Sequence, residues 1–580
     1  MKAHLALGIA LSTLLLGCNK QPETTTTHAV SHNEVQHRHA GELDPESVLY
    51  PEGDIPAKAY LAHNEVYNPE SVIPPQCYTK TEGENNPCFA CHQSYPRSAG
   101  RSNMMSDSDL QGDYQFSDVG MTNSWKNLFI DRTNLIAKIS DAEMKAYVSQ
   151  DNYTPFIKKQ EQNQHWAGEY ATLKGLAYPD TAFNQYGLAK DGSHWVSYNY
   201  KPFPSTFWPT NGSTDDAMIR LPKAFREHAG EYAFDVYFAN LALVEMAIKD
   251  LPEISVPALS EVKIGRDLNG NGKIEHEIKH IVRQSHYVGD AQNTPLKHML
   301  YPQETEFLHT VRYLGVDDNG DIYNAPRLKE LRYMKKHQDT TPETLRVSYM
   351  QEAKEKEFEN LPQTVYLGHR GIDNGFGWTI NGYIEDEKGE LRQQVHQELA
   401  FCNGCHKTVG STFDQTFSFA RKVEGEQGWG YIDLRAMSDV PNVAVDGLAS
   451  EKGEFLTYFE RVGGGDEFRQ NKEMLKKWFN PDGTVNAEKV AQAKTVYELI
   501  TPSPERAMAL NKAYWSIVKE QSFIYGRDAT IFEATNVLSE VDDNQAPLKE
   551  QHRYKWDLRL NWAEHTQPHQ AGSKKFLKSR

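Results

Sequence analysis

The sequence predicts a mainly α-helical protein with irregular and some β segments, in which a mixed central region separates two regions that each carry a Cys-x-x-Cys-His pentapeptide. Three observations predict this organisation. Helix-start signals recur along the chain, strand-like segments concentrate in its middle, and the C-terminal third has a mainly helical pattern. The chain has 580 residues, 39% of them hydrophobic and 11% aromatic, which is sufficient for several folded domains with cores of their own.

Three segments carry clear helix-start signals. Ser140 with Glu143 has the pattern of a capping box before the stretch 141–150. The stretches 341–361 and 503–523 each place a proline, Pro342 or Pro504, where the first turn of a helix tolerates it. We therefore expect a helix in each of these segments.

Strand-like segments lie between them. Residues 195–200, WVSYNY, are rich in aromatic and β-branched side chains. Residues 376–386, FGWTINGYIED, turn through Lys388 and Gly389 into a second extended segment, which predicts a hairpin.

The N-terminus has the features of an export signal. Lys2 precedes an apolar run over residues 5–16, which is too short to span a bilayer. The run ends LLGC, which resembles the lipobox of bacterial lipoproteins and implies cleavage before Cys18 and lipid attachment to that residue. An ordinary signal peptide with a stray cysteine is the alternative. By the same resemblance, Asn19 implies sorting to the outer membrane, with the protein facing the periplasm or the cell exterior.

The segment after the signal is polar and contains four histidines, for which a solvated linker is favoured over a metal site. The expected division of the chain is a signal peptide over 1–17, a flexible tether over 18–43, a first pentapeptide region over 44–150, a mixed α/β region over 151–340, a second pentapeptide region over 341–440 and a helical region over 441–580.

Charge and cysteine count exclude some classes of protein. Lys and Arg total 62 against 79 Asp and Glu, so the net charge of −17 argues against a nucleic-acid partner and favours a partner with a basic patch. Of 6 cysteines, one is assigned to lipid and four to the pentapeptides, which excludes a disulfide-stapled fold. Cys77 is left as a small buried thiol, or as a redox thiol or thiolate ligand.

The two pentapeptides are CFACH at 88–92 and CNGCH at 402–406. Two thiols three positions apart can each add to one vinyl group of a haem, and the next residue is placed to bind the iron. Both motifs resemble those of c-type cytochromes, here of a bacterial, exported, di-haem kind. The resemblance implies two covalent haem c groups with iron bound by His92 and His406, and with thioether links to Cys88, Cys91, Cys402 and Cys405. Zinc and thioredoxin-like chemistry are the alternatives; no second cysteine pair lies close in sequence to either motif.

The sixth iron ligands stay open at this level. Methionine raises a haem potential and histidine lowers it, so their identity decides what each haem does. The candidates are Met104, Met105, Met121, Met437, His369 and His396.

HEIKHIVRQSH, at 276–286, has the histidine spacing of metzincin proteases. That family's glycine is replaced by Arg283, and the preceding residues alternate as a strand does, which separates His276 from His280. A zinc protease site is therefore disfavoured, and we expect these histidines to pack or to act as a distal haem ligand.

DLNGNGKIE, at 267–275, resembles the start of a calcium loop, yet the twelfth position holds Ile278 in place of glutamate. Weak calcium binding and a plain Asn-Gly hairpin are both open. DDNG at 317–320 is expected to be a turn.

The function that these observations favour is extracytoplasmic electron transfer by a membrane-anchored di-haem cytochrome. Its partner would be a redox protein or a small-molecule electron donor or acceptor. The competing function is a di-haem enzyme similar to the dihaem peroxidases and the related oxygenases, in which one haem relays electrons and the other binds substrate. A haem-bearing protease or binding protein is a third, less favoured possibility.

Overall fold

The computed structural model describes residues 73–93, 101, 108–205, 207–358, 364–407, 409–445, 452–464, 470–542 and 544–562. All of them belong to one compact unit, Pro45–Arg580. The signal peptide, the tether, Met104 and Met105 lie outside the described residues.

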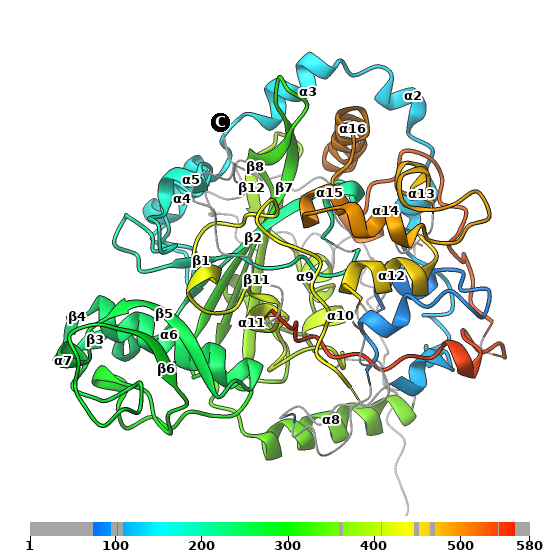
Figure 1. Ribbon diagram of the computed structural model, residues 1–580. Helices are drawn as coiled ribbons and strands as arrows, with labels where there is room; N and C mark the ends of the chain where they lie inside the picture. Colours follow the sequence, from blue (N-terminus) through cyan, green and yellow to red (C-terminus); the bar gives the residue numbers. More distant parts are fainter. Residues whose placement is uncertain are drawn as a thin grey trace, which may run out of the picture. The chain divides into compact units, whose positions relative to one another are not determined.

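The centre of this unit is an antiparallel sheet of eight strands (Figure 1). The strand order is β1-β2-β7-β8-β11-β10-β9, and β12 pairs with β11. The strands are β1 Val196–Tyr198, β2 Thr214–Arg220, β7 Glu306–Val316, β8 Ile322–Lys336, β9 Val365–Tyr366, β10 Ile372–Asp373, β11 Trp378–Glu385 and β12 Leu391–Gln393. The prediction of a mainly α-helical fold is therefore wrong.

The longest hairpin, β7 and β8, was not predicted from the sequence pattern. Its strand β8 contains charged residues at many positions, because buried carboxylates on neighbouring segments pair with them: Arg327 bonds to Glu385 at 2.6 Å, and Lys336 pairs with Asp414. Burial of paired charges removes the alternation of apolar and polar residues that identifies a strand. The turn expected at 317–320 is confirmed and joins the two strands.

One face of the sheet is covered by an apolar layer. Met218 of β2, Leu308 of β7 and Leu331 of β8 are buried there with side chains of α4, Tyr153–Gln162. The opposite face carries the functional site described below.

Helix α6, Phe234–Lys249, is buried on almost all sides and packs against β5, Glu253–Leu259, and α11, Ser418–Arg421. A helix with no solvent face shows no helical periodicity of polar residues, which explains why the sequence did not reveal it. β5 pairs with β6, Ile278–Val282, and Figure 1 shows this pair beside α6 at the lower left.

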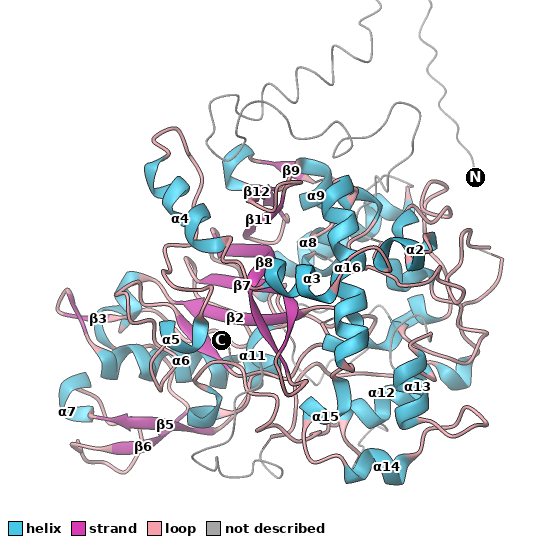
Figure 2. Cartoon of the chain, turned by 90° about the horizontal axis from the view of Figure 1, so that it is seen from above, coloured by secondary structure: helices cyan, strands magenta, loops and turns pink. Residues whose placement is uncertain are grey.

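The three helices predicted from start signals are present as α3, Asp141–Val148, α8, Pro342–Glu357, and α16, Pro504–Glu520. The Ser140 hydroxyl accepts a hydrogen bond of 3.1 Å from the Glu143 N–H, and the Ser503 hydroxyl accepts one of 3.2 Å from the Arg506 N–H. In Figure 2, α3 and α16 lie beside β7 and β8, in agreement with the contacts between these elements.

The remaining helices are short. They are α2 Thr133–Ile136, α5 Pro179–Ala182, α7 Glu261–Ile264, α9 His396–Ala400, α10 Asn403–His406, α12 Glu454–Val462, α13 Lys472–Trp478, α14 Ala487–Gln492 and α15 Val496–Ile500, and the strands β3 Glu227–His228 and β4 Glu231–Tyr232 form a small separate hairpin. The chain after Glu520 is irregular, and its described residues contain only the short 3₁₀ turns Phe523–Tyr525 and Glu550–His552.

Candidate functional site

The two pentapeptides adopt the same local turn. In the first, the His92 N–H donates to the Cys88 carbonyl oxygen at 2.8 Å; in the second, the His406 N–H donates to the Cys402 carbonyl oxygen at 3.0 Å. Positions i, i+3 and i+4 of a helical turn share one side. Each motif therefore presents two thiols and an imidazole from the same side of its turn.

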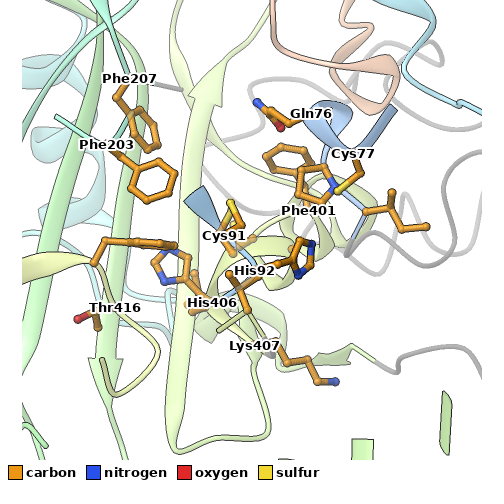
Figure 3. Close-up of a pocket in the computed structure, with 18 of the residues that line it drawn as sticks. Gln76, Cys77, Cys91, His92, Phe203, Phe207, Phe401, His406, Lys407 and Thr416 are labelled. Atoms are coloured by element: carbon orange, nitrogen blue, oxygen red, sulfur yellow. The ribbon is translucent and has the colours of Figure 1, made fainter. Parts of the chain in front are cut away.

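Both motifs line a single cavity of about 1590 Å³. Figure 3 shows Cys91, His92 and His406 around this space, with Phe203 and Phe207 on its wall. Pockets for one small ligand usually measure about 300–1,000 Å³. The cavity thus has room for more than one large group, and it brings together two motifs that are far apart in the sequence.

The uncovered face of the sheet is one wall of the cavity. Because side chains alternate along a strand, every second residue of adjacent strands reaches it. Three strands contribute such residues. They are Asp215 and Ala217 of β2, with Ser213 directly before that strand; Phe307, His309 and Val311 of β7; and Glu330, Arg332 and Met334 of β8.

The first pentapeptide is held by the C-terminal end of the described chain. The Phe89 ring is fully buried and meets the Trp556 ring edge-on, with centroids 4.8 Å apart. The Gln111 side-chain amide donates to the carbonyl oxygens of His92 and Tyr554, at 2.8 Å each. The first motif is therefore held by the Gln111 side chain and by residues 554–556, which are distant from it in sequence.

The second pentapeptide is held by α8 and by the segment before β11. The Asn374 side-chain amide donates to the His406 carbonyl oxygen at 2.7 Å. The next residue, Lys407, forms an ion pair of 3.0 Å with Glu352 of α8.

The His406 ring has the protonation state that a metal ligand needs. Its Nδ1 lies 2.8 Å from the Gln415 carbonyl oxygen, which only accepts, so Nδ1 carries the proton and Nε2 keeps its lone pair. Burial lowers the pKa of His406 to about 4, which keeps the imidazole neutral.

The cysteines of the motifs are half-buried, and their thiols are not activated. Burial raises the pKa of Cys88 to about 12 and that of Cys405 to about 11, and it also raises the pKa of Cys402. Thiols that exchange disulfides have a lowered pKa. Each described cysteine is a free thiol, and the described ranges contain no group of three Cys, His, Asp or Glu side chains placed to hold a metal ion. The raised thiol pKa values differ from those of a thioredoxin-like site.

Cations lie close to the second motif. The guanidinium groups of Arg332 and Arg527 both bond to Glu330, at 3.0 and 2.9 Å. Both arginines line the cavity together with Cys402 and Cys405. Two guanidinium groups that share one carboxylate have further N–H groups that can donate to a second carboxylate. Thiol pairs, a neutral imidazole, these cations and the cavity volume together fit covalently attached haem.

The sixth-ligand candidates that the structure describes do not line the cavity. Met121 packs on the cluster around Trp125, and Met437 is buried in the main core. His369 stacks on Trp166 with ring centroids 4.3 Å apart, and His396 lies beside Tyr366. Cys77 does line the cavity, near Phe401 (Figure 3).

The residue that sequence reasoning missed is His309, whose side chain faces the cavity from β7. Its signal was the β-branched and aromatic content of EFLHTVRYL, 306–314, which is typical of a strand.

The histidines of HEIKH do not form a site. His280 lies on β6, where a strand was expected, and both His276 and His280 are exposed and away from the cavity. The expectation that these histidines pack or act as a distal ligand is therefore wrong.

The carboxylates of the loop at 267–275 accept hydrogen bonds from other residues of the same loop. Asp267 accepts hydrogen bonds from the N–H groups of Gly270 and Gly272, at 2.8 and 2.7 Å. Glu275 accepts from the side-chain amides of Asn269 and Asn271. Calcium binding stays a prediction.

Comparison with known proteins identifies the family. A family model described as "-like lipoprotein" matches residues 61–497. A protein of Aquifex aeolicus (strain VF5), named "Uncharacterized lipoprotein", is 30% identical over 559 residues, which cover 85% of this chain and 92% of the relative. The chain belongs to this lipoprotein family. No solved structure matches it.

Membership confirms the lipoprotein prediction and supports an exported, lipid-anchored protein. Cys18 itself lies outside the described residues. In the part of the chain that the structure describes, no helix is both long and apolar enough to cross a membrane.

Proposed function

We propose that this lipoprotein is a di-haem c-type cytochrome that transfers electrons outside the cytoplasm. The observation that supports it best is the shared cavity: Cys88, Cys91 and His92 line it together with Cys402, Cys405 and His406. Haem bound there would supply one-electron chemistry.

The residues of the chain have separate roles in this proposal. The four thiols would hold the two haems covalently, and His92 and His406 would bind iron. The Gln415 carbonyl oxygen orients the His406 ring through Nδ1. Arg332 and Arg527, which both pair with Glu330 and line the cavity, would neutralise haem carboxylates. The aromatic side chains on the wall exclude water, which sets the potential.

Two haems held in one cavity would exchange electrons without movement of the protein. The ring of His406 is 6.0 Å from that of Phe417, which also lines the cavity, so the interior between the motifs is rich in aromatic side chains. The function is therefore a relay within one protein rather than two independent sites.

The partner docks, in this proposal, on α8. Glu352, Glu355 and Glu357 line the rim of the cavity from this helix. Met350 on the same helix and Phe358 directly after it are 63% and 68% exposed, so apolar side chains stand among the acidic ones. Apolar contact inside a charged rim is the anatomy of a protein interface. With a chain charge of −17, the fitting partner is a basic redox protein.

The anchor places this relay at a membrane. Lipid on Cys18 holds the protein there, and Asn19 favours the outer membrane.

The test of function uses spectra of the purified protein in both redox states, with carbon monoxide and peroxide added. A carrier has two six-coordinate, low-spin haems that ignore both reagents. An iron that binds carbon monoxide and reacts with peroxide would instead establish the di-haem enzyme and reject the carrier.

A further inference from the structure

We propose that His309 is the sixth ligand of the iron that His406 binds. This inference rests on the proposed di-haem function and names the residue that completes one of its two sites.

The position of His309 comes from the sheet. It lies on β7, paired in register with Ala217 of β2 and Arg332 of β8, and all three line the cavity. Among the residues that the structure describes, three histidines line this space: His92, His406 and His309. Only His309 lies outside a pentapeptide.

The ring of His309 is held as metal-binding histidines are held. Its Nε2 is 3.0 Å from Oδ2 of Asp215, a carboxylate whose side chain is only 4% exposed, whereas that of His309 is 25% exposed. A carboxylate accepts, so Nε2 carries the proton and Nδ1 keeps the lone pair that binds metal. Such a carboxylate fixes the tautomer and the orientation of the ring.

A second contact fixes the ring plane. The Phe207 ring meets the His309 ring edge-on, with centroids 5.3 Å apart. The imidazole is therefore held by Asp215 and Phe207 before any ligand arrives, which reduces the cost of ordering it.

His309 belongs with the second motif. His309 and His406 line the same cavity. Phe203 and Phe207 share one segment, and Phe203 packs on Phe417, which is itself beside His406. One wall thus runs from His309 to His406.

Met334 is the competing ligand. It lies on β8 and also lines the cavity, but it packs within the main apolar core. Histidine and methionine have opposite effects on haem potential, so the two assignments are separable by measurement.

The experiment compares the haem-loaded wild type with His309→Gly, His309→Met and His369→Ala by electron paramagnetic resonance, visible spectra and redox titration. We expect His309→Gly to convert one of the two haems to a high-spin form that binds carbon monoxide, and added imidazole to restore the low-spin spectrum. His309→Met should stay low-spin with a raised potential in one haem. His369→Ala, which alters a histidine away from the cavity, should match the wild type.

Two results would overturn the assignment. One is an unchanged pair of low-spin haems in His309→Gly. The other is loss of a sixth ligand in Met334→Leu but not in His309→Gly. Protein without haem would reject the proposed function itself, whereas two haems with unaltered spectra in the His309 variants would reject only this inference.

Discussion

The N–H of Ser411 donates a hydrogen bond of 3.1 Å to the carbonyl oxygen of Cys91. Cys91 belongs to the first pentapeptide and Ser411 follows the second, so this bond ties the two motifs together at the cavity wall. The folded chain therefore brings the two pentapeptides, which are far apart in the sequence, into one site.

The thioether assignment predicts selective loss of haem. Cys402→Ser with Cys405→Ser should remove one of the two haems, and Cys88→Ser with Cys91→Ser should remove the other, because each pair holds its own macrocycle. The haem-to-protein ratio measures this. Cys77→Ser is the matched control, since Cys77 lines the same cavity outside any motif, and it should keep both haems. Retention of two haems in either double variant would contradict the assignment.

Removal of the Phe89 ring should destabilise the protein by about 3–5 kcal/mol, since it empties a fully buried site against Trp556. Urea unfolding of Phe89→Ala measures the free energy of unfolding. Phe358→Ala deletes the same ring from an exposed position and should change stability by less than about 0.5 kcal/mol. Equal effects of the two substitutions would show that the first motif is not anchored by this contact.

Lys329 should make stability depend on pH. Burial lowers its pKa from 10.5 to about 7, and its Nζ donates a hydrogen bond of 2.6 Å to the Gly212 carbonyl oxygen. Between these pH values the unfolded chain holds a proton that the folded protein has released. The free energy of unfolding therefore rises with pH across this window, by up to about 1.4 kcal/mol per pH unit from this group.

Lys329→Met removes that contribution. The slope of unfolding free energy against pH, from about pH 7.5 to about 9, should be smaller than in the wild type by close to one proton. Lys223→Met alters an exposed lysine and should keep the wild-type slope. A slope that is the same in all three proteins would mean that Lys329 is not a neutral, buried group.

The acidic rim on α8 should favour cationic redox reagents. Glu355→Lys with Glu357→Lys should slow reduction by a ruthenium hexaammine complex and speed oxidation by ferricyanide, and high salt should weaken both effects. Stopped-flow rates test this. Glu143→Lys, a charge reversal on α3, serves as the control. If it alters the rates as much as the α8 variants do, electrons do not enter or leave at α8.

Local signals in the sequence predicted local structure well. Ser140 and Ser503 cap the helices expected after them, and the segment around Lys388 and Gly389 turns between β11 and β12 as expected. These features depend on a few adjacent residues. The β7–β8 hairpin and α6 depend instead on tertiary contacts. In the hairpin, buried ion pairs remove the alternation of apolar and polar residues that predicts a strand. In α6, nearly complete burial removes the polar face that predicts a helix.

In the candidate site, too, local features could be predicted from the sequence and tertiary features could not. The pentapeptides were evident from their spacing, since each is one turn of chain. Their meeting, and the presence of His309 and Asp215 beside them, depends on strand register, which a single sequence does not reveal.

The mass of the exported protein, produced in cells that attach haem c, tests the central claim most directly. The account predicts an intact mass higher than that of the processed polypeptide and its lipid by two haems, with a visible spectrum of low-spin haem. A colourless protein with the polypeptide and lipid mass only would contradict it.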